Sequence, residues 1–92
     1  MKAELTKWLN LCRKAGAVAA GADAVKKAIR TNKAYLTLTA KDAGAISRDV
    51  GPHTATDMSK EELGVLTGRR ETSVIAITNK ELALKLKEIL NI

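Results

Sequence analysis

A glycine turn opens directly into a cationic helix at residues 21–30, which read Gly21-Ala22-Asp23-Ala24-Val25-Lys26-Lys27-Ala28-Ile29-Arg30. Glycine lets the backbone approach another molecule closely, and the first N–H groups of a helix have no partner inside that helix. An anion such as a phosphate can accept hydrogen bonds from these groups. Because lysines and an arginine stand beside the opening, the stretch predicts an anion-binding helix start.

Further helices are indicated on both sides of this stretch. Leu5, Leu9 and Cys12 recur at helical spacing in residues 3–15, and Gly16 ends that helix. Residues 59–62, Ser-Lys-Glu-Glu, form a capping box, which predicts another helix start. Five helices are expected in all. They cover residues 3–15, residues 21 to a cap at Asn32, and residues 59–68. A short helix is expected from Asp42 through Ile46 and Val50 to Gly51, and a final helix after a cap at Asn79.

Four strand candidates fall between these helices, at residues 17–20, 35–39, 53–56 and 74–77. Residues 74–77, Val-Ile-Ala-Ile, are the most apolar run in the chain and suit a buried central strand. Residues 35–39 are rich in strand-forming side chains and suit an inner strand. The alternation predicts an α/β fold, namely a three-layer α-β-α sandwich with a small mixed four-stranded sheet, in a single domain over residues 1–92.

The positive charge is concentrated in the first part of the chain. The net charge is +6, and residues 1–41 hold nine lysines and arginines against two acids, whereas residues 42–92 hold seven against eight. A basic half indicates a nucleic-acid or other anionic partner. Trp8 and Tyr35 are the only aromatic residues, so the stacking platforms of many single-strand binders are missing. This composition favours recognition of folded RNA by its shape and backbone.

The sequence lacks the signatures of several other classes of protein. It contains no GxSxG, GxxxxGK[ST], GxGxxG or HExxH motif, so we expect no enzyme. One cysteine and one histidine cannot supply a zinc site with nitrogen and sulfur ligands, and we expect neither metal nor cofactor. No apolar run approaches the ~20 residues that cross a membrane. The first residues also lack the apolar core of a signal peptide, so we expect a cytosolic monomer with no membrane partner.

A second cationic feature lies in the predicted loop Gly68-Arg69-Arg70-Glu71-Thr72. Either feature alone has a plain explanation as a solvated surface. Loops and helix starts at one edge of a layered sheet can converge, however, and arginine suits forked contacts to phosphate or guanine. The residues that we expect to contact RNA are Gly21, Ala22, Asp23, Lys26, Lys27, Arg30, Lys41, Arg48, Arg69 and Arg70.

Five segments in register resemble a known family. They are Leu9-Asn10-Leu11-Cys12-Arg13-Lys14-Ala15-Gly16, Gly21 through Arg30, Ala40-Lys41-Asp42-Ala43, Ser59-Lys60-Glu61-Glu62-Leu63-Gly64 and Val74-Ile75-Ala76-Ile77-Thr78. Their order and spacing are similar to those of the kink-turn-binding ribosomal-protein family of L-seven-Ae and L-thirty-e type, in particular to its small bacterial YlxQ-type members. The resemblance implies an α-β-α sandwich in a ribosomal or other ribonucleoprotein setting.

The resemblance also implies how RNA would be held. The family places the start of its second helix beside the sheared G·A pairs of a kink-turn and covers flipped-out bases with the loop before the last strand, here residues 68–73. The family's pattern is Gly-x-Asn-Glu followed three residues later by Lys. Gly21 and Lys27 match it, whereas Asp23 and Ala24 replace the Asn and Glu. A protein-interaction module that kept the fold and lost specific RNA binding is therefore an alternative, and a third is a domain like the substrate-RNA domain of an RNA methyltransferase, acting only by binding.

Overall fold

Two buried strands form the centre of the molecule. The computed structural model describes residues 2–45 and 49–92. Every residue of β2 (Leu36–Thr39) and of β4 (Val74–Ile77) is buried. The continuous apolar run of β4 is typical of a strand that is covered on both faces. The two strands pair antiparallel, with Leu38 opposite Ile75. The prediction of a central strand at residues 74–77 is thereby confirmed.

The outer strands complete a mixed sheet. Its order is β1-β4-β2-β3, with β1 (Val18–Ala20) antiparallel to β4 and β3 (Thr54–Ala55) parallel to β2. Both edge strands are short, which limits the unpaired backbone that the sheet exposes. Because β2 lies inside the sheet, the prediction of an inner strand is also confirmed.

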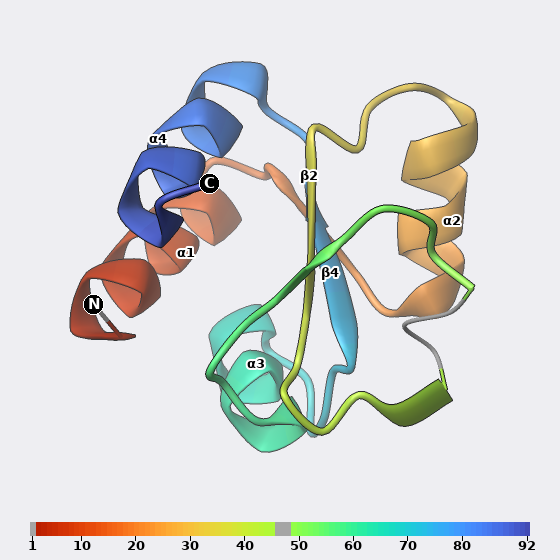
Figure 1. Ribbon diagram of the computed structural model, residues 1–92, viewed down its shortest axis with the longest axis horizontal. Helices are drawn as coiled ribbons and strands as arrows, with labels where there is room; N and C mark the ends of the chain where they lie inside the picture. Colours follow the sequence, from red (N-terminus) through yellow and green to blue (C-terminus); the bar gives the residue numbers. More distant parts are fainter. Residues whose placement is uncertain (1, 46–48) are drawn as a thin grey trace.

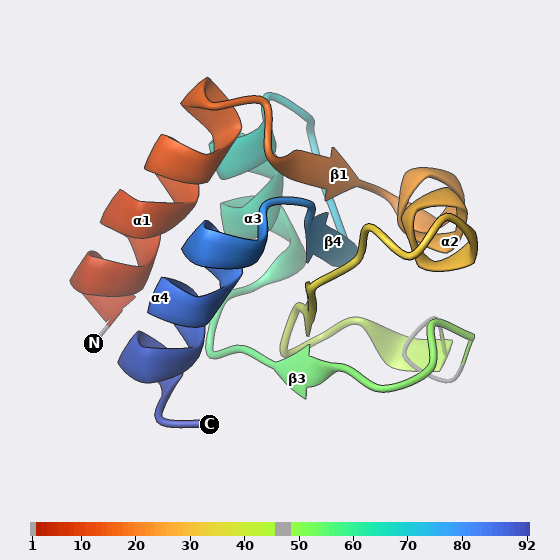
Figure 2. The same cartoon turned by 90° about the horizontal axis from the view of Figure 1, so that it is seen from above.

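Helices cover the two faces of the sheet unequally. Figures 1 and 2 show α1 (Lys2–Lys14), α3 (Lys60–Thr67) and α4 (Lys80–Leu90) on one face and α2 (Ala22–Arg30) on the other. These are the three layers that the alternation of helices and strands predicts. Within the described residues, no helix is long and apolar enough to span a membrane.

Each face of the sheet has its own apolar cluster, because successive side chains of a strand point to opposite faces. Ile75 and Ile77 join the larger cluster under α1, α3 and α4, whereas Val74 and Ala76 join the smaller cluster under α2. Cys12 is completely buried in the larger cluster, and this burial raises the pKa of its thiol. Cys12 thus lies on the buried face of α1 with Leu5 and Leu9, as their helical spacing in the sequence indicates.

Local sequence signals place the helix ends. The Ser59 hydroxyl accepts the Glu62 N–H at 3.1 Å and the Glu62 carboxylate accepts the Ser59 N–H at 3.0 Å, which confirms the capping box. Gly68 ends α3 with a left-handed φ of 72°. Asn79 caps α4 by accepting the Leu82 N–H at 2.9 Å.

Asn32 follows α2 in a left-handed conformation with φ of 58°. The Asn32 N–H donates to the Ile29 carbonyl and the Lys33 N–H to the Ala28 carbonyl, the two bonds of a Schellman motif. The predicted cap at Asn32 is therefore confirmed, and α2 has defined ends on both sides.

The connection from β2 to β3 differs in one respect from expectation. The short helix was predicted through Ile46, which lies outside the described residues, although residues 44 and 45 have 3₁₀ geometry. Asp42 was expected to cap that helix, and its carboxylate instead accepts the Lys60 N–H at 2.9 Å. Asp42 thus satisfies a free donor at the start of α3. Val50 is buried at 2% exposure in the cluster beneath α2.

Candidate nucleic-acid interface

The start of α2 is fixed to the sheet by its glycine. Gly21 has a φ of 90°, a conformation that side chains rarely adopt, and its N–H donates to the Val74 carbonyl at 3.0 Å. No side chain caps the N-terminus of this helix. Ala22 and Asp23 occupy the first turn, and Asp23 is exposed. The first N–H groups of α2 are therefore available to a group outside the protein.

Arg69 lies directly over this turn. A Cβ atom on Gly21 would be 3.3 Å from Nη2 of Arg69 and 3.4 Å from its Cζ, so the guanidinium rests on the open face of the glycine. The Arg69 Nη1–H also donates to the Ala20 carbonyl at 3.3 Å. The structure therefore places Arg69 of the predicted loop against the turn that opens α2, and its hydrogen bond to Ala20 spans 49 residues of the sequence.

A second glycine holds the arginine loop in position. A Cβ atom on Gly64 would lie 2.7 Å from the carbonyl oxygen of Arg70 and 2.8 Å from that of Arg69. The Arg69 N–H donates to the Gly64 carbonyl at 2.8 Å, and the Thr72 N–H donates to the Lys60 carbonyl at 3.0 Å. Residues 69–72 are thus packed against α3 by backbone contacts. The side chain of Arg70 is exposed and makes no polar contact among the described residues.

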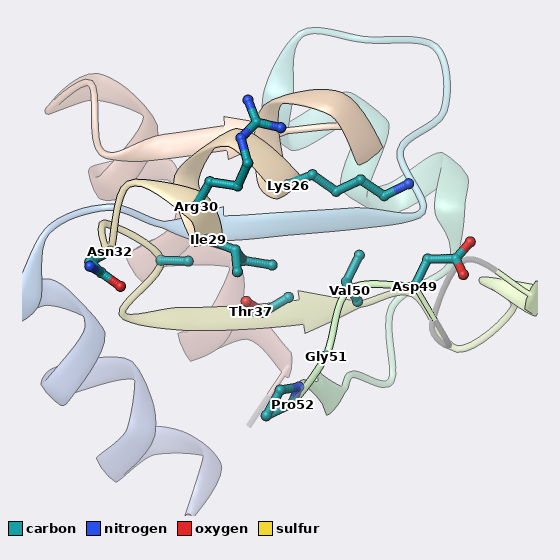
Figure 3. Close-up of a pocket in the computed structure, with 10 residues that line it drawn as sticks. Lys26, Ile29, Arg30, Asn32, Thr37, Asp49, Val50, Gly51 and Pro52 are labelled. Carbon is teal, nitrogen blue, oxygen red and sulfur yellow. The ribbon is translucent and has the colours of Figure 1, made fainter.

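The cations of α2 do not form one cluster. Lys26 and Arg30 line a groove of about 630 Å³ between α2, β2 and residues 49–52, and Ile29, Val50 and Pro52 supply much of its apolar surface. In Figure 3, Lys26 extends along the groove toward Asp49, and Arg30 projects away from it.

Lys27 lies on the other flank of α2, with Lys33 and Thr78 around a smaller hollow of about 300 Å³. Adjacent residues of a helix point about 100° apart, which accounts for this division. The sequence placed Lys26, Lys27 and Arg30 together, and the structure separates Lys27 from the other two.

Lys41 is the one remaining predicted contact residue that the structure describes, and it lies beyond the end of β2. Lys41 is the second residue after β2, is exposed, and donates its N–H to the Met58 carbonyl at 2.8 Å. It precedes Asp42, whose carboxylate binds the start of α3. Arg48 lies outside the described residues.

Arg13 is a neighbour of this surface that the sequence did not single out. A Cβ atom on Gly68 would lie 2.5 Å from Nη2 of Arg13, so this guanidinium rests against the residue before Arg69. In the sequence, Arg13 reads only as a polar position of an amphipathic helix. No local pattern indicates a contact with a loop 55 residues later in the chain.

The chemistry of this surface is that of anion binding. It offers free backbone donors at the start of α2 and exposed guanidinium and ammonium groups, which suit phosphate oxygens. The described residues contain no group of three or more His, Cys, Asp or Glu side chains placed to hold a metal ion.

Comparisons with known proteins find similar structures. No family model and no curated protein matches the sequence. A structure described as a protein with unknown function from Bacillus halodurans is 21% identical, has a TM-score of 0.85, and the match covers 96% of this chain and 97% of that one. The Giardia lamblia 15.5kD RNA binding protein is 22% identical, has a TM-score of 0.74, and the match covers 98% of this chain and 87% of that one. At these identities the likeness shows a shared α-β-α fold over nearly the whole chain.

Proposed function

We propose that this protein binds structured RNA without catalysing a reaction, and that it recognises a kink-turn or a similarly bent internal loop. The observation that carries the proposal is the contact between Arg69 and Gly21, which places a guanidinium group with no ion pair among the described residues beside an uncapped helix N-terminus. A phosphate at this place would meet backbone N–H donors and a cation together. The likeness to an RNA-binding protein of the same fold supports this assignment.

The charge distribution supports an RNA partner as well. Lys27, Lys33 and Arg69 approach the start and one flank of α2, and neither Lys27 nor Lys33 forms an ion pair among the described residues. Unpaired cations along one helix favour the binding of a polyanion, because binding releases the counterions of the polyanion. We place the protein in the cytosol, within a ribosomal or other ribonucleoprotein particle.

The direct test is a gel-shift titration with two RNAs. One is a kink-turn duplex, and the other is the same duplex with its G·A pairs converted to Watson-Crick pairs. We expect tighter binding of the kink-turn duplex at every salt concentration. Equal affinity for the two RNAs would remove kink recognition and leave only electrostatic binding, which weakens steeply with added salt.

A second candidate is a protein-interaction module of the same fold. Asp23 favours it, because an exposed carboxylate in the first turn of α2 repels phosphate and lacks the amide donor of asparagine. Purification of the protein from its own cells separates the two functions. A stoichiometric protein partner without nucleic acid would support the module, whereas co-purifying RNA would support the first proposal.

A further inference from the structure

The guanidinium group of Arg13 lies against Gly68 in the link between α3 and β4, and the next residue of this link is Arg69. We propose that these two arginines together clamp the phosphate backbone of a bound RNA. Arg13 belongs to the last turn of α1, and Arg69 belongs to the link itself. This inference rests on the proposed RNA-binding function and extends its surface to α1. In Figure 2 the link passes between the end of α1 and the start of α2.

Both guanidinium groups are seated on glycines. Nη2 of Arg13 lies 2.5 Å from the position that a Cβ atom on Gly68 would occupy, and Nη2 of Arg69 lies 3.3 Å from the equivalent position on Gly21. Both glycines have positive φ angles, 72° and 90°, so their backbone conformations already favour glycine. The missing side chains leave room for the guanidinium groups against the backbone.

The donors of the clamp are largely unused. The guanidinium of Arg69 makes one hydrogen bond, to the Ala20 carbonyl, and that of Arg13 makes none among the described residues. Each guanidinium carries five N–H donors in a planar fork that matches phosphate oxygens. The pair therefore has enough free donors to hold a phosphate in forked geometry.

The charges of the clamp are also uncompensated. Neither Arg13 nor Arg69 forms an ion pair with a carboxylate in the part of the chain that the structure describes. An anion bound beside these two groups would supply the missing opposite charge. Contacts to phosphates position a protein on RNA without reading its bases. We therefore assign the clamp to the phosphate backbone of a stem that adjoins the α2 contact.

Lys14 provides a matched control for Arg13. Both residues lie in the last turn of α1, are exposed, and carry a positive charge that interacts favourably with the negative end of the helix dipole. Arg13→Ala and Lys14→Ala thus remove one charge each from the same turn, and only the first removes a contact to Gly68. Melting curves of both variants establish that each is folded.

The experiment measures the affinity of wild type and variants for the kink-turn duplex and its fully paired counterpart over a series of salt concentrations. We expect Arg13→Ala to weaken both complexes by the same factor, about 3- to 10-fold at low salt. It should also lower the slope of log affinity against log salt by about one. Arg13→Lys should recover the slope but only part of the affinity, because it restores charge without the fork.

Several outcomes would overturn the clamp. One is an equal loss of RNA affinity for Arg13→Ala and Lys14→Ala. Another is a change, in Arg13→Ala, in the preference for the kink-turn over the fully paired duplex, because this would indicate that Arg13 reads a base. NMR of the unaltered protein adds an independent readout: inorganic phosphate should shift the Gly68 amide and the arginine Nε–H signals, and unchanged signals would contradict the proposal. Equal wild-type affinity for both RNAs, by contrast, would overturn kink recognition and leave the clamp standing.

Discussion

At the scale of single residues, Gly64 holds the arginine loop in position because it has no side chain. Gly64→Ala would place a Cβ atom 2.7 Å from the Arg70 carbonyl oxygen, so either the arginine loop or α3 must shift. Because the close atoms belong to the backbone and not to a flexible side chain, this overpacking falls in the upper part of the usual range, about 2–3 kcal/mol, and the better helix propensity of alanine offsets about 1 kcal/mol. We expect a net loss of about 1–2 kcal/mol in the free energy of unfolding, measured by urea denaturation.

The neighbouring Val65 supplies the control for this prediction. Its side chain is 75% exposed on the same helix, so Val65→Ala should change stability by less than about 0.5 kcal/mol. A Gly64→Ala protein as stable as wild type would show that the loop can move away from α3 at no cost. The sequence contains Gly64 within the family resemblance, but its close contact with residues 69 and 70 is visible only in the structure.

At the scale of elements, the start of α3 depends on two side chains that satisfy different N–H groups. Ser59 accepts the Glu62 N–H, and Asp42 accepts the Lys60 N–H. We expect Ser59→Ala to cost about 1 kcal/mol and Asp42→Ala about 0.5–1 kcal/mol of unfolding free energy. Because the two bonds are separate, the double variant should lose approximately the sum.

Asp57→Ala serves as the control for the two caps, since this exposed acid between β3 and α3 makes no hydrogen bond or ion pair among the described residues. It should change the unfolding free energy by less than about 0.5 kcal/mol. A double variant that loses no more than Ser59→Ala alone would show that the Asp42 contact contributes nothing.

The same two caps show which parts of the fold can be predicted from sequence. The capping box joins residues three positions apart, so a local pattern is sufficient to find it. The Asp42 contact spans 18 residues and the Arg69 contact spans 49, and both depend on how the layers pack. The sequence therefore predicted α1, α2, α3, α4 and the central strands, whereas the region of the candidate site stays a prediction. It could not predict that Asp42 binds α3 or that Arg13 reaches Gly68.

At the scale of the whole molecule, α2 is the only α-helix on its face of the sheet among the described residues, and a hollow lies along each of its flanks. Lys26 lines one flank, beside the large groove, and Lys27 lines the other, beside Lys33. Consecutive residues of one helix thus present the same charge to two different surfaces. Composition and net charge do not depend on whether the two lysines face one surface or two. For this reason, reading the charge of the stretch did not distinguish Lys26 from Lys27.

This division makes Lys26→Ala and Lys27→Ala a matched pair for locating the RNA. If RNA contacts the flank that carries Lys27, as the family resemblance implies, Lys27→Ala should weaken kink-turn binding by about 1–3 kcal/mol, the range of a good base contact. Lys26→Ala removes the same charge one residue away and should cost less than about 1 kcal/mol at moderate salt. Gel-shift titration of both variants against one kink-turn duplex gives the comparison. Equal losses of affinity would show that both lysines contribute only their positive charge. A larger loss for Lys26→Ala would indicate that the RNA lies over the groove instead.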